Sequence, residues 1–222
     1  MDTIHNQEIA NFLDYTFSPF LQHNISNKNE LLKYIEIVSN IQVSEFVDYI
    51  MQNYKRQPIY ASDVFQFSKL EDAMIRVCLC VKKANNPGMK FKKIGELLLD
   101  DGEQRSDIAF CKYGENHIKT AELLGLAFKN ESLYYLSVFG LIIDELPNSL
   151  RKKLLTRLIL RNKLISQLII SSKNSTIDLE AFLYDLSQTT YLRRRTNIKQ
   201  IIEYLCDTDE YDFSHLIKNI KY

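Results

Sequence analysis

GENHIKTAELLGLAFKNESLYYLSVFG occupies residues 114–140 and decides the fold that we expect for the middle of the chain. Its first half carries apolar side chains at three- and four-residue spacing, which predicts a helix that ends near Gly125. The runs LAF and LYYLS that follow are rich in β-prone residues and are joined by KNES, which predicts a small hairpin. A helix that runs directly into such a hairpin is typical of a winged helix-turn-helix module.

The residues before this stretch supply the other helices of such a module. Residues 68–84 predict a helix opened by Ser68, the NNPG that follows predicts a turn, and residues 90–99 predict a short helix. Residues 105–126 predict a third helix, interrupted near Gly114. Three helices followed by a hairpin make residues 66–144 a first winged-helix module.

Residues 145–222 repeat this plan without repeating its residues. Residues 146–172 predict one long helix, and residues 175–188 predict a short helix capped by Ser175 or Thr176. TTYLRRRTNIKQIIEYL, residues 189–205, then predicts a second recognition helix, capped by Thr189 or Thr190. We therefore expect a second winged-helix module with an acidic tail.

Residues 1–65 predict an acidic helical region, with amphipathic helices over about 5–18, 28–39 and 42–55. We expect it to serve in packing or subunit contact. The expected fold is therefore mainly α: an N-terminal helical region followed by two winged helix-turn-helix modules with small β-hairpin wings.

Charge is unevenly distributed, although the 28 basic and 28 acidic residues balance overall. Residues 1–65 hold four Lys or Arg against eight Asp or Glu. Residues 146–205 hold eleven against four. A basic C-terminal part favours a polyanion as its partner, although a solvated basic face is the simpler alternative.

Helical geometry predicts which side chains of the two recognition helices face outward. On the first helix, Ile118, Ala121 and Gly125 fall on one side, with the structural histidine His117 near them. The expected DNA contacts lie opposite and are Asn116, Lys119 and Thr120. A generic amphipathic helix would show the same polar outer side.

On the second helix, one stripe is apolar and consists of Tyr191, Ile198, Ile202 and Leu205, with Ile201 at its edge. Arg193 projects away from it and can read guanine, while Asn197 and Gln200 can read adenine. Arg194 and Arg195 lie near the stripe, where their stems cover the core and their guanidinium groups reach phosphates or acidic partners. The expected DNA contacts of this helix are Thr190, Arg193, Arg194, Arg195, Asn197, Lys199 and Gln200.

GENHIKTAELLGLA with YYLSVFG resembles the third helix and wing of winged-helix target-recognition domains of type II restriction endonucleases. SQTTYLRRRTNIKQIIEYL is similar to a second winged-helix segment of the same proteins. The resemblance covers about residues 66–205 and implies recognition of double-stranded DNA by tandem winged helices. It also implies DNA contacts at Asn116, Lys119 and Thr120, and at Thr190, Arg193 and Arg194.

Those endonucleases carry a nuclease domain, and this sequence departs from them there. No Asp or Glu stands two residues before any Lys, as a PD-(D/E)xK metal site requires. The four His are isolated, HIK lacks the Asp of a phospholipase-D-type motif because Leu124 stands there, and no GK[ST] phosphate loop occurs. We expect no catalytic residues, no metal site and no cofactor.

The expected function is therefore double-stranded DNA recognition, as the specificity part of a restriction-type system whose nuclease is another chain. A separate nuclease subunit and a homodimer are the protein partners left open. A helical protein–protein adaptor and a winged-helix transcriptional regulator are the alternatives. The acidic N-terminus, the lack of a spanning apolar run and four unpaired cysteines predict a cytoplasmic protein with reduced thiols and no membrane contact.

Overall fold

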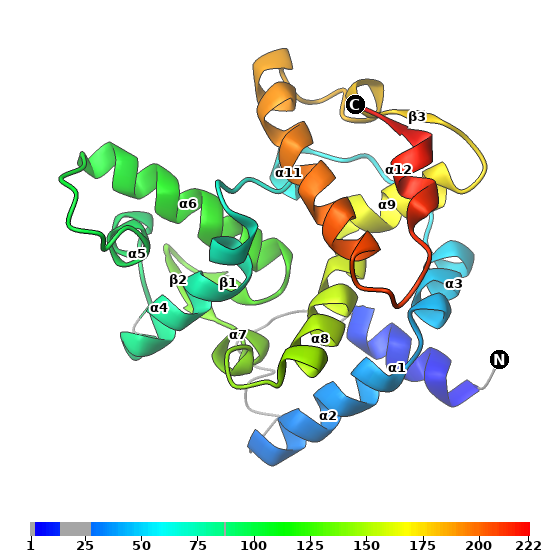
Figure 1. The fold of residues 1–222 in the computed structure, drawn as a ribbon, viewed down its shortest axis with the longest axis horizontal. Helices are drawn as coiled ribbons and strands as arrows, with labels where there is room; N and C mark the ends of the chain where they lie inside the picture. Colours follow the sequence, from blue (N-terminus) through cyan, green and yellow to red (C-terminus); the bar gives the residue numbers. More distant parts are fainter. Residues whose placement is uncertain (1–2, 14–27, 87) are drawn as a thin grey trace. The chain divides into compact units, whose positions relative to one another are not determined.

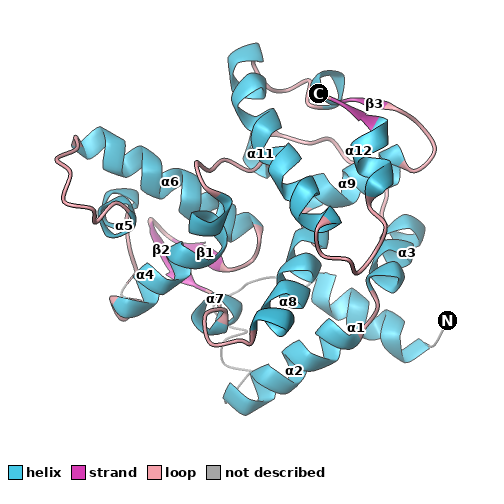
Figure 2. Cartoon of the chain, in the orientation of Figure 1, coloured by secondary structure: helices cyan, strands magenta, loops and turns pink. Residues whose placement is uncertain are grey.

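The computed structural model describes residues 3–13, 28–86 and 88–222, and it is mainly helical, as expected (Figures 1 and 2). The chain divides into two compact units. The terminal unit comprises Met1–Tyr15, Leu32–Val64 and Lys152–Tyr222, and the central unit comprises Thr16–Leu31 and Phe65–Arg151. The sequence pattern suggested three consecutive parts, whereas here the acidic N-terminal helices group with the basic C-terminal segment.

The central unit contains a helix from Leu70 onward, two further helices, a hairpin and a last short helix. Its first helix lacks the expected opening at Ser68 and includes a π-helical turn. The elements are η3 (Asp72–Arg76), α4 (Val77–Lys83), α5 (Phe91–Leu98), α6 (Asp107–Leu123), β1 (Ala127–Asn130), β2 (Leu133–Leu136) and α7 (Val138–Ile142).

Helices α5 and α6 approach each other at two glycines. A Cβ atom at Gly114 would lie 2.0 Å from the carbonyl oxygen of Phe91, and one at Gly95 would lie 1.9 Å from that of Phe110. The interruption of α6 predicted near Gly114 is wrong, since α6 is continuous. This glycine removes a side chain from a helix contact and does not break the helix.

The end of α6 explains the Leu-Gly-Leu of the sequence. Gly125 has a φ of 72°, a left-handed conformation that favours glycine. The N–H groups of Gly125 and Leu126 donate to the carbonyl oxygens of Glu122 and Ala121, both at 2.8 Å, which closes the helix. Leu124 and Leu126 are fully buried on either side of this turn.

The hairpin predicted from LAF and LYYLS is confirmed. Strands β1 and β2 pair antiparallel with Ala127 opposite Leu136. Met89, just before α5, exchanges two backbone hydrogen bonds of 2.9 Å with Tyr134 of β2. The hairpin thus gains a third chain segment on its β2 side.

The terminal unit is built from helices around an aliphatic and aromatic core that includes Phe12 and Phe46, whose rings meet edge to face at 6.0 Å. Its elements are α1 (Thr3–Leu13), α2 (Lys28–Asn40), α3 (Val43–Asn53), η2 (Ala61–Asp63), α8 (Asn148–Leu160), α9 (Lys163–Ser172), β3 (Ile177–Asp178), α10 (Leu179–Phe182), α11 (Gln188–Cys206), α12 (Ser214–Asn219) and β4 (Ile220–Lys221). Two of the boundaries between the units fall within α2 and α8, and another lies between Val64 and Phe65, after η2. The first predicted helix reached residue 18, and residues 14–18 lie outside the described ones.

The single long helix predicted over residues 146–172 is wrong. Two helices, α8 and α9, occupy this stretch, because Asn162 caps the second one by accepting a hydrogen bond from the N–H of Ile165 at 3.3 Å. The predicted caps further along also differ. Asp178 caps α10, and Ser187 is the residue at the start of α11.

No hairpin wing follows α11 in residues 145–222, all of which the structure describes. The strands there, β3 and β4, are two residues long and pair in parallel. The order of elements expected for a second winged-helix module is therefore present only as far as its last helix.

Candidate nucleic-acid interface

The outer side of α6 holds two of its three predicted contact residues. Lys119 is exposed, pairs with Glu115 at 2.5 Å and lies 5.5 Å from the ring centre of Phe91. Asn116 is partly buried. In the half of α6 that carries these residues, Lys119 is therefore the one basic side chain, and it is already paired with an acid.

The prediction that Thr120 faces outward is wrong. Its side chain is fully buried. The Thr120 hydroxyl donates to the carbonyl oxygen of Gln66 at 2.8 Å and accepts from the N–H of the same residue at 3.1 Å. These two hydrogen bonds of Thr120 hold the segment before η3 against α6.

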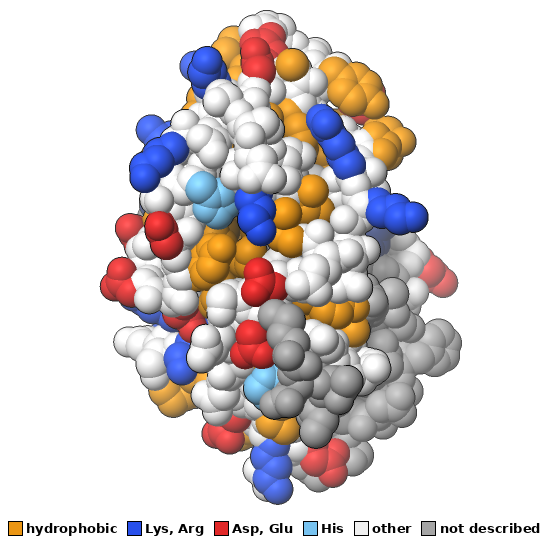
Figure 3. Space-filling model, turned by 90° about the vertical axis from the view of Figure 1, so that its right-hand side faces the viewer, with side chains coloured by type: hydrophobic (Ala, Val, Ile, Leu, Met, Phe, Trp, Pro, Cys, Tyr) orange, Lys and Arg blue, Asp and Glu red, His pale blue; other side chains and the backbone are white. Residues whose placement is uncertain are grey.

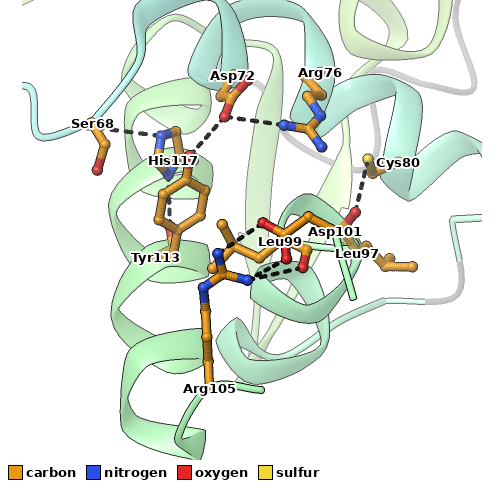
Figure 4. Close-up of polar contacts among 10 residues, drawn as sticks. All are labelled: Ser68, Asp72, Arg76, Cys80, Leu97, Leu99, Asp101, Arg105, Tyr113 and His117. Atoms are coloured by element: carbon orange, nitrogen blue, oxygen red, sulfur yellow. Dashed lines mark hydrogen bonds and ion pairs between the residues drawn. The ribbon is translucent and has the colours of Figure 1, made fainter. Parts of the chain in front are cut away.

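The N-terminal end of α6 is acidic. The preceding loop carries Asp101 and Glu103, both paired with Arg105. The Arg105 guanidinium lies 2.7 Å from Asp101, as Figure 4 illustrates, and 2.6 Å from Glu103. The hydrogen bonds from Arg105 hold the pKa of Asp101 at about 2. Asp107 of the first turn pairs with Lys92 at 2.6 Å. Phosphate groups would meet no excess of positive charge here.

The inner side of α6 carries a polar cluster (Figure 4). Asp72 of η3 is buried and accepts hydrogen bonds from the Tyr113 hydroxyl at 2.7 Å and from Arg76 at 3.5 Å. Burial first, and then this bond to Asp72, raises the pKa of Tyr113 to about 12. The ring of His117 stacks near Tyr113 at 4.1 Å between centroids.

His117 is a core residue, as expected. Its Nδ1 lies 2.7 Å from the carbonyl oxygen of Tyr113, and its Nε2 lies 3.4 Å from the N–H of Ser68. These partners require a neutral ring with the proton on Nδ1. Burial lowers the pKa of His117, which keeps the ring neutral.

Helix α11 buries the predicted apolar stripe and leaves the opposite side exposed. Tyr191, Ile198, Ile201, Ile202 and Leu205 are all buried. Arg193, Thr196 and Lys199 are exposed, while Thr190 and Gln200 are partly buried. Arg193 rests on its own helix, with Nε 3.3 Å from the carbonyl oxygen of Thr189.

Two predicted DNA-contact residues of α11 have partners or burial that the sequence pattern does not indicate. Asn197 is 7% exposed and belongs to the buried side, so it cannot reach a base edge without unpacking the helix. Arg194 donates to the carbonyl oxygens of Ala61 and Val64, the latter at 3.3 Å. Its stem runs inward as predicted, and its guanidinium is bound to backbone carbonyl oxygens.

Arg195 lies over the ring of Tyr191, with its guanidinium carbon 6.0 Å from the ring centre. Burial raises the pKa of Tyr191, and a hydrogen bond from Arg195 opposes this shift. The three consecutive arginines thus have different surroundings: solvent for Arg193, backbone for Arg194 and an aromatic ring for Arg195.

No acidic residue occurs in α11 before Glu203, whereas four basic residues do. Lys199 lies 3.7 Å from Glu203, and both side chains are at least half exposed. Such an exposed pair contributes little and leaves Lys199 available. The charged side chains of α11 before Glu203 are therefore all basic, while Glu180 and Asp178 of the preceding segment act electrostatically on Tyr191.

Sequence reasoning missed two exposed apolar side chains, one on α11 and one in the segment before it. Leu192 is 44% exposed and Tyr184 is 70% exposed. Leu192 could have been found from its position, since it falls outside the apolar stripe at helical spacing. The face drawn in Figure 3 carries both basic and acidic side chains, with apolar groups between them.

Within the described residues, no group of three or more His, Cys, Asp or Glu side chains is placed to hold a metal ion. The four cysteines form no disulfide, and Cys78 alone of the four is buried. None of the helices in the described part of the chain is long and apolar enough to cross a membrane. Comparison of the chain with protein-family models, curated proteins and solved structures gave no match.

Proposed function

We propose that this protein binds double-stranded DNA, with the exposed side of residues 188–200 of α11 as its main contact. The observation that carries the proposal is the charge of this helix. Its basic residues precede its first acid, Glu203, and Arg193 and Lys199 among them are exposed. Phosphate contacts by Lys and Arg supply most of the sequence-independent affinity for duplex DNA.

The residue types on this side also suit base recognition. Arg193 can donate two hydrogen bonds to guanine, and Gln200 can pair with adenine. Arg193 is held only by bonds to its own helix, at 3.3 Å to Thr189 and 3.5 Å to Thr190, so it can extend at small cost. The helix N-terminus adds a positive end that favours a phosphate nearby.

The order of elements in the central unit supports a winged-helix module. A helix, the bridged residue Met89, α5, α6 and the β1–β2 hairpin follow one another, which is the plan in which a third helix enters the major groove. The acidic start of α6 argues for a weaker contact here than at α11, made through Lys119 and Asn116.

The resemblance to target-recognition domains extends the proposal to sequence-specific binding, as the specificity part of a restriction-type system. A second candidate, a protein–protein adaptor, is favoured by one observation in the central unit. Ile108 in the first turn of α6 is 69% exposed next to the acidic loop, as a protein contact would require and a phosphate contact would not.

The experiment is selection of bound duplexes from a random pool by the full chain, followed by binding of the preferred duplex at several salt concentrations. We expect nanomolar to micromolar binding that weakens as salt rises. The variant Arg193→Ala/Lys199→Ala should lower the slope of log affinity against log salt by about two units. Lys173→Ala, an exposed lysine outside α11, is the control and should change the slope less.

Absence of any salt-dependent duplex binding would overturn the proposal. Unchanged slopes in the double variant would remove α11 from the interface. Cleavage that requires Mg²⁺ and follows the protein through purification would show a nuclease that the sequence does not reveal.

A further inference from the structure

Leu192 lies on the side of α11 that the proposed function assigns to DNA. Its side chain is 44% exposed although the stripe of buried apolar residues lies on another side of the helix. Its helical neighbours three residues before and four residues after are Thr189 and Thr196, both exposed. Leu192 thus has a threonine one turn away on either side, and these three side chains, called the Leu192 strip, lie on a helix with several basic residues.

We infer that this strip contacts the C5-methyl group of a pyrimidine in the major groove, an inference that rests on the proposed function. Thymine carries this methyl group, and 5-methylcytosine carries it at the same position of the groove. Apolar side chains and threonine methyl groups are the protein groups that contact it, because they neither donate hydrogen bonds to a base edge nor accept them from it.

The surroundings of Leu192 favour DNA over a protein as the occupant. Arg193 is its direct neighbour, and Arg195 and Lys199 follow on the same helix without an intervening acid. The Leu192 strip itself consists of one Leu and two Thr, which is far smaller than a stable protein interface needs. Charge complementarity and size therefore both point to a groove lined by phosphates.

Arg193 and Leu192 would divide the recognition between them. Arg193 offers donors to a guanine, while Leu192 gains by excluding water from a methyl group. The expected target is then a site in which a C5-methyl pyrimidine lies near a guanine. A site that lacks such a pyrimidine would leave Leu192 facing water.

The test replaces each thymine of the preferred duplex by uracil, which keeps the charge and the hydrogen-bonding edge and removes only the methyl group. We expect the full chain to bind about threefold to tenfold more weakly when a contacted methyl group is removed. In a second set of duplexes, 5-methylcytosine replaces each cytosine of the site in turn. Tighter binding of one of these duplexes would show that the recognised methyl group can be that of 5-methylcytosine as well as that of thymine. Uracil outside the bound site is the control and should have no effect.

Leu192→Ala should bind the thymine duplex as weakly as the uracil duplex, since the two changes remove the same contact. Ile217→Ala, on α12 and 52% exposed, is the matched control and should keep the preference for the methyl group. Failure to bind any duplex would overturn the proposed function. Binding that ignores the methyl group, or a Leu192→Ala variant that weakens both duplexes equally, would overturn this inference alone.

Discussion

Arg157 of α8 and Glu210, in the segment after α11, form an ion pair inside the terminal unit. One guanidinium nitrogen lies 2.5 and 2.6 Å from the two carboxylate oxygens. The Arg157 side chain is 2% exposed and also donates to the carbonyl oxygen of Ile41 at 2.7 Å. One side chain thus joins three segments that are distant in the sequence. Because the Arg157 guanidinium is charged and buried, the loss of any of these partners would leave a buried charge without compensation and would cost free energy of folding.

Glu210→Ala should destabilise the protein, because it leaves the Arg157 charge buried beside backbone carbonyls alone. We expect a loss of about 2–4 kcal/mol, at the low end for a buried pair because the Glu210 side chain is 19% exposed. Glu203→Ala removes an exposed partner of Lys199 and should cost less than about 0.5 kcal/mol. Urea unfolding followed by circular dichroism compares the two, and equal losses would contradict the assignment of a buried pair.

Gly114→Ala separates two opposing effects. Helix propensity alone predicts that alanine stabilises α6 by about 1 kcal/mol. The new Cβ atom would however lie 2.0 Å from the Phe91 carbonyl oxygen, so we expect destabilisation by about 1–3 kcal/mol or more. The sign of the change in the urea midpoint shows which of the two effects is larger. Lys112→Ala, at an exposed position of the same helix, is the control. A more stable Gly114→Ala variant would show that α5 and α6 are less closely packed.

Periodic apolar spacing predicted most helices and the stripe of α11, because burial of one helix side follows from the local pattern. What the pattern missed lies where a distant segment decides. The carbonyl acceptors of Arg194, at Ala61 and Val64, are more than a hundred residues away in sequence, so the local pattern does not indicate them. Thr120 looked exposed because nothing local indicates that Gln66 crosses over it.

The break between α8 and α9 shows a different limit. Asn162 is a good capping residue, but apolar spacing continues on both sides of it, so the pattern alone favours one helix. Leu192 was overlooked for the opposite reason. Its exposure has meaning only once the rest of the α11 surface is known to be basic.

His117 should make stability depend on pH. Burial lowers its pKa in the folded state below the ordinary value of 6.5, so the unfolded chain binds the proton more readily. Stability is then greatest above about pH 6.5 and falls as pH falls below it, until the folded ring itself is protonated. A charged ring would also lose the hydrogen bond from the Ser68 N–H.

The measurement is the urea midpoint at pH 7.5 and at lower pH. The His117→Gln variant, although less stable, should show a smaller decrease of the midpoint as pH falls. An equal fall in that variant would assign the pH dependence to other groups.

Arg193 and Arg194 are neighbours with opposite predicted roles. Arg194→Ala removes the guanidinium that holds the carbonyl oxygens of Ala61 and Val64, so we expect a loss of stability of about 1–3 kcal/mol. Arg194→Lys keeps the charge but not the planar fork and should also lose stability. The stability of Arg193→Ala should stay within about 0.5 kcal/mol of that of the parent protein, because the Arg193 side chain is exposed.

For binding to duplex DNA, we expect the opposite order of effects. Arg193→Ala should lower the slope of log affinity against log salt by about one unit, whereas folded Arg194→Lys should keep this slope. If Arg194→Lys retains full stability but binds duplex more weakly, then Arg194 contacts DNA and its bonds to Ala61 and Val64 are incidental.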